Sequence, residues 1–251
     1  MAGCRILLRR AKAVPVLWKR CAGLLCCWAA AAAGAAPASS PPQLFTAPAA
    51  GSYALQSIQP APNGRVLDSA GGAADFARFS KGRVTLLSFI YTYCSDPLGC
   101  PLAYAVMHDL RQRLLAKPAL ARRVRFVSLS FDPVNDTPEA MRRYAGRLAD
   151  VGNTLQWHFL TTQSVQHLKP LVDGLGQSVQ VQLDSRGRPG RLFSHMLKVF
   201  LLDARGEVRE IYSTAFLQPD VMFNDIETLL MEQDRAGRKR LAAARRWQTK
   251  Q

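Results

Sequence analysis

The chain has 251 residues, of which 48% are hydrophobic and 20% charged; this is enough apolar material for one domain with a sizeable core, and it excludes a disordered chain. The formal net charge of +15 comes mostly from the two ends. Residues 1–36 carry six basic residues and no acid, residues 234–251 carry seven and one, and residues 37–233 carry 20 and 17. Because the excess lies outside the predicted domain, the composition argues against nucleic acid as a partner.

The N-terminal segment, residues 1–36, has the features of a signal peptide. A basic stretch is followed by an apolar run over residues 22–36, which contains the small-residue pattern Ala33-Gly34-Ala35. The alternative is a retained membrane anchor, although about 15 apolar residues fall short of the roughly 20 that span a bilayer. Cleavage would remove four of the six cysteines and leave Cys94 and Cys100 in an exported protein. Residues 37–50, rich in Pro, Ala and Ser, predict a flexible linker.

The first half of the predicted domain, residues 51–233, alternates strands and helices. "SYALQSIQ" and "GRVLDS" predict a short N-terminal hairpin, and "VTLLSFIY" predicts a buried central strand. After a cysteine-containing loop, "PLAYAVMHDLRQRLLAK" predicts a helix that has Pro101 in its first turn. "RVRFVSLSFD" predicts a second buried strand, and "DTPEAMRRYAGRLA" predicts a helix capped by Asp136 or Thr137.

The second half continues the alternation. "LQWHFLTT" predicts a strand, "SVQHLKPLVDGLG" a helix interrupted at Pro170, and "HMLKVFLLDARGEVREIYS" a hairpin that turns at residues 203–206. "QPDVMFNDIETLLMEQ" predicts an amphipathic helix, and residues 234–251 form a basic C-terminal tail that could contact an anionic membrane surface. This order predicts an α/β fold of the thioredoxin-like type, with a mixed central sheet flanked by helices and an N-terminal β-hairpin.

The loop "YTYCSDPLGCPLAY" joins a buried strand to the beginning of a helix. The free N–H groups and the positive dipole end at a helix N-terminus stabilise a thiolate, and we expect this effect to lower the pKa of Cys100 more than that of Cys94. Two thiolates together with an imidazole would suit copper or zinc. The spacing alone leaves open whether Cys94 and Cys100 form a disulfide or bind a metal.

The chain has four histidines. His108, His158 and His167 lie on a helix, a strand and a helix without any pattern of partners, and we interpret them as surface or structural residues. His195 precedes the apolar strand "MLKVFLLD", where a loop could carry it over the end of the sheet. Position alone does not make it a ligand.

Three segments in order carry a resemblance to a known family. "VTLLSFIYTYC...CP", "FVSLSFDPVNDTPEAMRRYA" and "SHMLKVFLLDARGEV" resemble the Sco (SenC) family of copper-binding, thioredoxin-like assembly proteins, over about residues 52–232. The resemblance implies that Cys94, Cys100 and His195 bind a copper ion and that the two thiols can cycle to a disulfide. It also implies a protein of the periplasm, or of the periplasmic face of the inner membrane, that helps to mature the copper centre of a cytochrome c oxidase.

The implied partners are the copper-accepting subunit of the oxidase and a thiol reductant. An exported thiol-disulfide oxidoreductase that reduces cysteines of a partner is the alternative function, because thiol exchange requires only an accessible thiolate.

The sequence departs from the family pattern at two places. The usual cysteine spacing is C-x3-C, whereas five residues separate Cys94 from Cys100, and Ser194 stands where an Asp usually precedes the histidine. Asp132 and Asp136 match the acidic motif of the family. We interpret Asp136 as a helix cap, and Asp132 as a turn former that orients the site indirectly.

Overall fold

The structure, a computed structural model, describes residues 45–149 and 154–248. The predicted signal peptide and residues 37–44 of the predicted linker lie outside the described residues. Within residues 45–50, the carbonyl of Pro48 accepts a hydrogen bond of 2.8 Å from the side chain of Asn224. In the described part of the chain, no helix has the length and hydropathy of a membrane-spanning segment.

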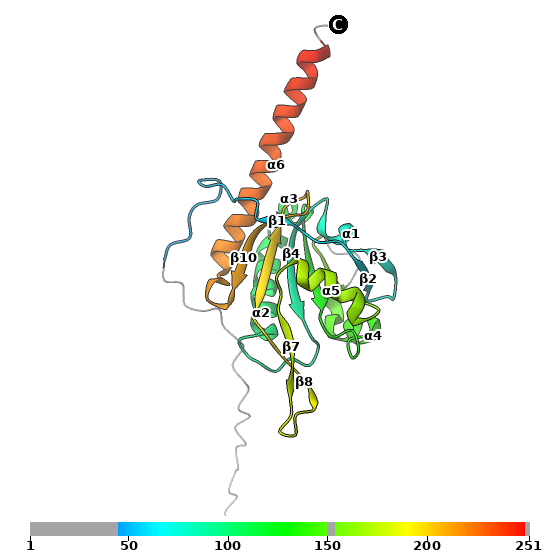
Figure 1. Cartoon of the computed structure of the whole chain (residues 1–251). Coiled ribbons are helices and arrows are strands. Elements are labelled where there is room, and N and C mark those ends of the chain that lie inside the picture. The colour runs from blue at the N-terminus through cyan, green and yellow to red at the C-terminus, as the bar shows by residue number, and fades with distance from the viewer. Residues whose placement is uncertain (1–44, 150–153, 249–251) are drawn as a thin grey trace, which may run out of the picture. The chain divides into compact units, whose positions relative to one another are not determined.

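The centre of the fold is a mixed eight-stranded sheet (Figure 1). In spatial order its strands are β1 (Gln59–Pro60), β10 (Glu207–Ser213), β9 (Lys198–Leu202), β4 (Val84–Ile90), β5 (Val124–Ser130), β6 (Gln156–Thr161), β2 (Arg65–Asp68) and β3 (Ala73–Asp75). β4, β5 and β6 are parallel, and β9 runs antiparallel to β4. All residues of β4 and β5 are buried, as predicted for two central strands, although β5 includes Arg125, Ser128 and Ser130.

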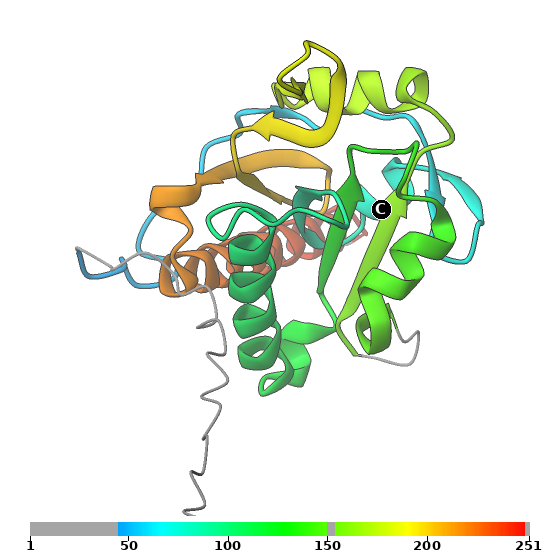
Figure 2. The same ribbon diagram turned by 90° about the horizontal axis from the view of Figure 1, so that it is seen from below.

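Helices cover both faces of this sheet (Figure 2). α2 (Cys100–Leu115), α4 (Pro138–Ala145) and the first part of α6 (Pro219–Gln248) lie on one face. α1 (Ala77–Ser80) and α5 (Val165–Gly174) lie on the other face, and α3 (Pro118–Ala121) follows α2. The predicted stripe on α2 is buried completely, and it consists of Leu102, Val106, Leu110 and Leu114. The mixed sheet with flanking helices confirms the predicted fold class.

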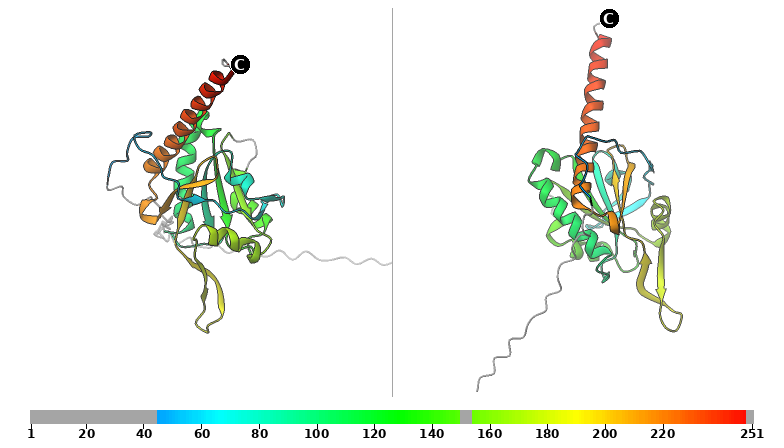
Figure 3. Two further views of the ribbon diagram at one scale, coloured as in Figure 1. Left: turned by 45° about the horizontal axis from the view of Figure 1, so that its top comes forward. Right: turned by 90° about the vertical axis from the view of Figure 1, so that its left-hand side faces the viewer.

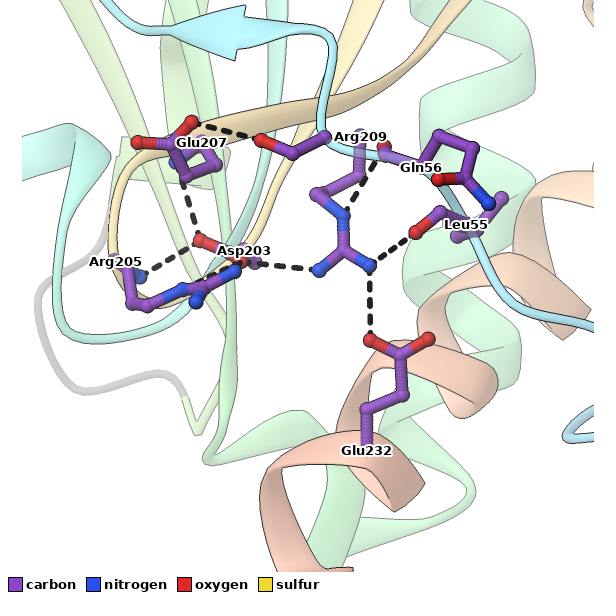
Figure 4. A network of polar contacts seen from close by, with 8 residues as sticks. Leu55, Gln56, Asp203, Arg205, Glu207, Arg209 and Glu232 are labelled. Carbon is purple, nitrogen blue, oxygen red and sulfur yellow. Dashed lines mark hydrogen bonds and ion pairs between the residues drawn. The ribbon is translucent and has the colours of Figure 1, made fainter. Parts of the chain in front are cut away.

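A polar network fastens the hairpin β9–β10 to α6 and to residues 55–56, which precede β1 (Figure 4). The guanidinium of Arg209, 8% exposed, donates to the carboxylate of Asp203 at 3.1 Å and to that of Glu232 at 2.9 Å. It also donates to the backbone carbonyls of Leu55 and Gln56. Every branch of this buried cation therefore has an acceptor, which is the condition for burying a charge without a large penalty.

Three predicted details differ in the structure. The N-terminal hairpin is formed by β2 and β3, whereas β1 pairs with β10, because the proline-containing connection at residues 60–63 does not turn β1 back onto β2. Pro170 does not interrupt α5, because Pro170 is exposed and the carbonyl of Gln166, which loses its helical partner, is on an exposed residue. The last helix continues past residue 233 to Gln248.

A second, two-stranded sheet was not predicted. β7 (Val179–Leu183) and β8 (Pro189–His195) form an antiparallel hairpin that stands out from the central sheet in both views of Figure 3. Most of its residues are exposed, so no continuous buried face imposes an apolar alternation on its sequence. The signal that the sequence does offer is the turn Asp184-Ser185-Arg186-Gly187, where Gly187 has a φ of 73°.

Candidate metal centre

Three side chains from three elements meet beside the carboxyl end of β4. Cys94 lies four residues after this strand, Cys100 is the first residue of α2, and His195 is the last residue of β8. Their sulfur and ring nitrogen atoms all lie within 4.8 Å of one another. Among residues 45–149 and 154–248, they are the single group of three or more His, Cys, Asp or Glu side chains that could hold a metal ion.

The cysteine loop closes through a local turn centred on Asp96. The side chain of Asp96 accepts from the N–H of Leu98 at 3.0 Å, and its backbone carbonyl accepts from the N–H of Gly99 at 3.0 Å. A β-carbon on Gly99 would lie 3.3 Å from atoms of Asp96, so the turn is tight at this position. The turn takes up the additional length of the C-x5-C spacing, and the sulfurs of Cys94 and Cys100 still come together.

Two buried carboxylates hold the residues that precede Cys94. Asp136, 0% exposed, accepts from the backbone N–H of Thr92 at 3.1 Å, from its hydroxyl at 2.6 Å and from the hydroxyl of Ser130 at 2.5 Å. Asp132 accepts from the hydroxyl of Tyr93. The prediction that Asp136 caps α4 is wrong, because Thr137 is the cap and accepts from the N–H of Ala140. The Asp136 side chain turns inward, where it joins β5 to the cysteine loop.

Asp132 has the predicted role of a turn former. Its backbone carbonyl accepts from the N–H groups of Asn135 at 3.2 Å and Asp136 at 2.8 Å, and its carboxylate accepts from the side chain of Asn135 at 2.8 Å. Together with its bond to Tyr93, these contacts link the acidic segment to the residue directly before Cys94.

The hairpin register and an aromatic cluster place His195. In the hairpin, His195 is opposite Val179, and its ring packs edge to face on Phe131 at a centroid distance of 4.7 Å and near Tyr91 at 6.2 Å. The side chain of Gln177 donates to the carbonyl of Met196 at 2.9 Å, which fixes the backbone just after the histidine. The predicted loop is therefore the base of a hairpin. Ser194 points away and accepts from the side chain of Gln182.

The two thiols are electrostatically unequal. The pKa of Cys94 is lowered to about 3, because its thiolate accepts hydrogen bonds from the Cys100 thiol, from His195, from the backbone N–H of Cys100 and from the hydroxyl of Tyr91. The pKa of Cys100 is raised, because its proton is shared with Cys94 and because its side chain is only 1% exposed. The expectation that Cys100 has the more strongly lowered pKa is wrong: the hydrogen bond to the Cys94 thiolate, together with burial, outweighs the effect of the helix N-terminus on the Cys100 pKa.

A sequence model described as SCO1/SenC matches residues 65–231, which is most of the domain. This chain belongs to the SCO1/SenC family. Over 89 residues it is 35% identical to a SCO1 protein homolog of Bacillus subtilis (strain 168), and the aligned part covers 36% of this chain and 42% of that protein. The chain thus spans less than half the length of the curated relative it matches.

Solved structures of Sco proteins share the fold of this SCO1/SenC protein. The copper-bound ScoI of Bradyrhizobium japonicum is 21% identical, with a TM-score of 0.53 over 66% of this chain and 96% of that chain. BsSco, a member of the Sco family of cytochrome c oxidase assembly proteins in which a disulfide switch has been identified, is 22% identical, with a TM-score of 0.53 over 70% and 96% of the two chains.

The donor set of this SCO1/SenC protein fits copper. Two sulfurs and one imidazole nitrogen are soft and intermediate donors. Copper prefers such donors, whereas harder cations prefer oxygen donors. Three donors that each lie about 2.0–2.3 Å from one ion in a trigonal arrangement are about 3.5–4.0 Å apart. Atoms that lie within 4.8 Å of one another would therefore move closer by about 1 Å at most before one ion contacts all three.

The other three histidines lie away from this centre, as expected. The ring of His108 stacks on Tyr104, the ring of His158 packs edge to face on Phe79, and His167 is bonded to Ser164. Tyr91, which donates to the Cys94 thiolate, and Gln177, which fastens the segment after His195, were not predicted. Neither residue carries a signal in the sequence, because Tyr91 lies at the end of an apolar strand pattern and Gln177 lies in an expected loop.

Proposed function

We propose that this protein is a copper-binding metallochaperone that assists assembly of the copper centre of a cytochrome c oxidase. The observation that carries the proposal is the convergence of Cys94, Cys100 and His195 within 4.8 Å. Membership of the SCO1/SenC family and the copper bound by a structural relative support it. Copper is the cargo, and its acceptor is the copper-binding subunit of the oxidase.

The site has the features that such a carrier requires. Cys94 is half-buried and already carries a thiolate, so an arriving cuprous ion meets a charged sulfur without prior loss of a proton. Cys100 is buried and protonated in the metal-free state, so it would lose its proton as the ion binds. His195 completes a three-donor set whose nitrogen comes from a separate hairpin.

Anaerobic titration of the reduced protein with cuprous ion tests the ligand set. We expect one ion per chain, and we expect His195→Ala to lower the affinity by more than about tenfold, the loss that accompanies removal of even an orienting partner of a ligand. His167→Ala, which changes an exposed histidine, is the matched control and should bind like the wild type. Equal affinity of the wild type and His195→Ala would contradict the assignment of this histidine.

The same geometry also favours thiol-disulfide exchange as a second function. The Cys94 thiolate is the accessible sulfur, and it would attack a disulfide of the partner to form a mixed disulfide and release one partner thiolate. Cys100 would then lose its proton and displace the second partner sulfur. Oxidation of Cys94 and Cys100 to a disulfide would thus supply the two electrons that reduce the partner disulfide to two thiols, and a thiol reductant would restore the pair.

Variants separate the two functions. Cys94→Ser and Cys100→Ser should each abolish reduction of a disulfide-containing peptide derived from an oxidase copper-binding subunit, whereas His195→Ala should retain it. The metallochaperone function requires all three side chains. Loss of copper transfer in His195→Ala with full reductase activity would therefore assign copper handling to the three-donor set and exchange to the thiols alone.

We also propose export of this protein, on the basis of the leader at residues 1–36, to the periplasm or the periplasmic face of the inner membrane. The second part of α6 extends beyond the sheet (Figure 1) and carries Arg235, Arg238, Lys239 and Arg240, which suit contact with an anionic membrane surface. Fractionation of cells that produce the full chain, followed by mass measurement of the recovered protein, tests both export and cleavage.

A further inference from the structure

A second site candidate is a cavity of about 440 Å³ far from the cysteines. It lies at the amino ends of β5 and β6, on the face that α1 covers, whereas the metal centre follows the carboxyl end of β4. Its volume falls within the range of roughly 300–1,000 Å³ that is usual for small-molecule sites. The lining residues that matter here are Asp68, Arg78, Phe79, Arg83, Arg125 and His158.

The cavity wall holds more positive than negative charge. Three guanidiniums face one carboxylate, that of Asp68, which is already engaged by the N–H groups of Ala70 and Gly72. Burial and the nearby guanidiniums lower the pKa of His158 to about 4, so this ring is neutral at pH 7. The lining therefore carries three positive charges and one negative charge, a net of +2.

Arg125 is the most constrained of these cations. It is 6% exposed, and its two terminal nitrogens donate to the backbone carbonyls of Arg78 and Lys81. Its Nε has no hydrogen-bond partner among the described residues. Within residues 45–149 and 154–248, no carboxylate forms an ion pair with Arg78, Arg83 or Arg125. A buried cation without a counter-charge is costly, and an external anion would supply that charge.

We propose that this cavity binds the phosphate group of a small phosphate monoester. A monoester carries a charge of about −1.5 to −2 at neutral pH, which matches the net charge of the wall, whereas a single carboxylate would neutralise only half of it. Guanidiniums donate in pairs to phosphate oxygens. Arg83 is half-buried and its terminal nitrogen is held by Gln156 at 3.2 Å, which keeps this cation at the cavity. The ring of Phe79 offers an apolar wall for the organic part.

Calorimetric titration of the reduced, metal-free protein with phenyl phosphate tests the site. Benzoate at the same ionic strength is the carboxylate counterpart, and inorganic phosphate tests the phosphate group alone. We expect saturable binding of phenyl phosphate, and we expect Arg83→Gln to weaken it by at least about tenfold, because hydrogen bonds to charged groups are the stronger class. Arg142→Gln, which removes an exposed cation of α4, is the charge-matched control and should bind like the wild type.

The pKa of the His158 ring provides a second readout, which is independent of copper binding and of the heat measured by calorimetry. A bound phosphate should raise the pKa of His158, followed by NMR of the ring protons, because it offsets the repulsion by the guanidiniums. Vesicles of phosphatidylcholine with phosphatidic acid distinguish a lipid source: binding that Arg83→Gln weakens identifies the phosphate as a lipid headgroup, and binding of phenyl phosphate alone identifies it as soluble. The absence of saturation with both probes, equal affinity for benzoate, or an unchanged affinity in Arg83→Gln would overturn the proposal.

Discussion

Asp136 offers the sharpest test of how the cysteine loop is held. Asp136→Ala removes one acceptor of three hydrogen bonds, which come from Thr92 N–H, Thr92 Oγ1 and Ser130 Oγ. Leaving a buried donor unsatisfied costs about 1–3 kcal/mol each. Thr92 is half-buried, so water can replace part of the hydrogen bonding that Thr92 loses. Removing the carboxylate also removes the cost of burying it, a cost that is reflected in the raised pKa of Asp136. We therefore expect a loss of about 3 kcal/mol in the free energy of unfolding.

The matched control is Thr137→Ala, one residue along the chain. Thr137 caps α4 with a single bond to the N–H of Ala140, and loss of such a cap costs about 1 kcal/mol. Guanidinium unfolding of the reduced, metal-free variants measures both values, provided that the slope m is unchanged. Asp136→Ala should also weaken copper binding, because Thr92 lies two residues before Cys94, whereas Thr137→Ala should not. A loss in Asp136→Ala no larger than that in Thr137→Ala would refute the inferred role of this carboxylate.

Three further predictions follow from charges at other positions. In the reduced, metal-free protein at about pH 5, iodoacetamide should alkylate Cys94 and spare Cys100. Cys100→Ala should slow the reaction, because it removes the main donor that lowers the Cys94 pKa. Equal alkylation of both thiols would contradict this. The pKa of His158 in the folded protein, about 4, lies below its ordinary value of 6.5, so the unfolded chain binds the extra proton as the pH falls. The free energy of unfolding should therefore fall by up to about 2–3 kcal/mol between pH 7 and pH 4. In phosphate-free buffer, His158→Gln should remove this part of the pH dependence. Arg209→Ala should cost about 3 kcal/mol or more in the free energy of unfolding, because it leaves Asp203 and Glu232 without their shared cation, whereas Arg143→Ala, which breaks an exposed pair with Glu139, should cost less than about 1 kcal/mol.

The buried elements could be predicted because one physical signal dominates each of them. The apolar-rich sequences of β4 and β5 favour burial on both faces, and the i, i+4 stripe of α2 favours a helix that packs through it. The hairpin β7–β8 escaped prediction because it is exposed, so its sequence carries no burial period.

The site was predictable in its members but not in its electrostatics. Cys94, Cys100 and His195 could be named together through the resemblance to the Sco family, and their convergence within 4.8 Å agrees with it. The order of the two thiol pKa values could not be derived, because it depends on which thiol donates to the other and on which sulfur is buried. The inward turn of the Asp136 side chain also required the structure, since sequence offers the same cap to Asp136 and to Thr137.

Because His195 is the last residue of β8, the register of the hairpin β7–β8 determines which side chain completes the metal centre. The hydrophobic core fixes the two cysteines, whereas the imidazole is presented by a hairpin in which His195 is opposite Val179 and Ser194 is opposite Gln180. Neighbouring residues of a strand point to opposite faces, so a slip of one residue would turn the imidazole away and bring Ser194 or Met196 to its position, depending on the direction of the slip. Insertions in the exposed turn at residues 184–188 that preserve this pairing are therefore tolerable, whereas those that shift it by one residue remove the nitrogen donor from the site.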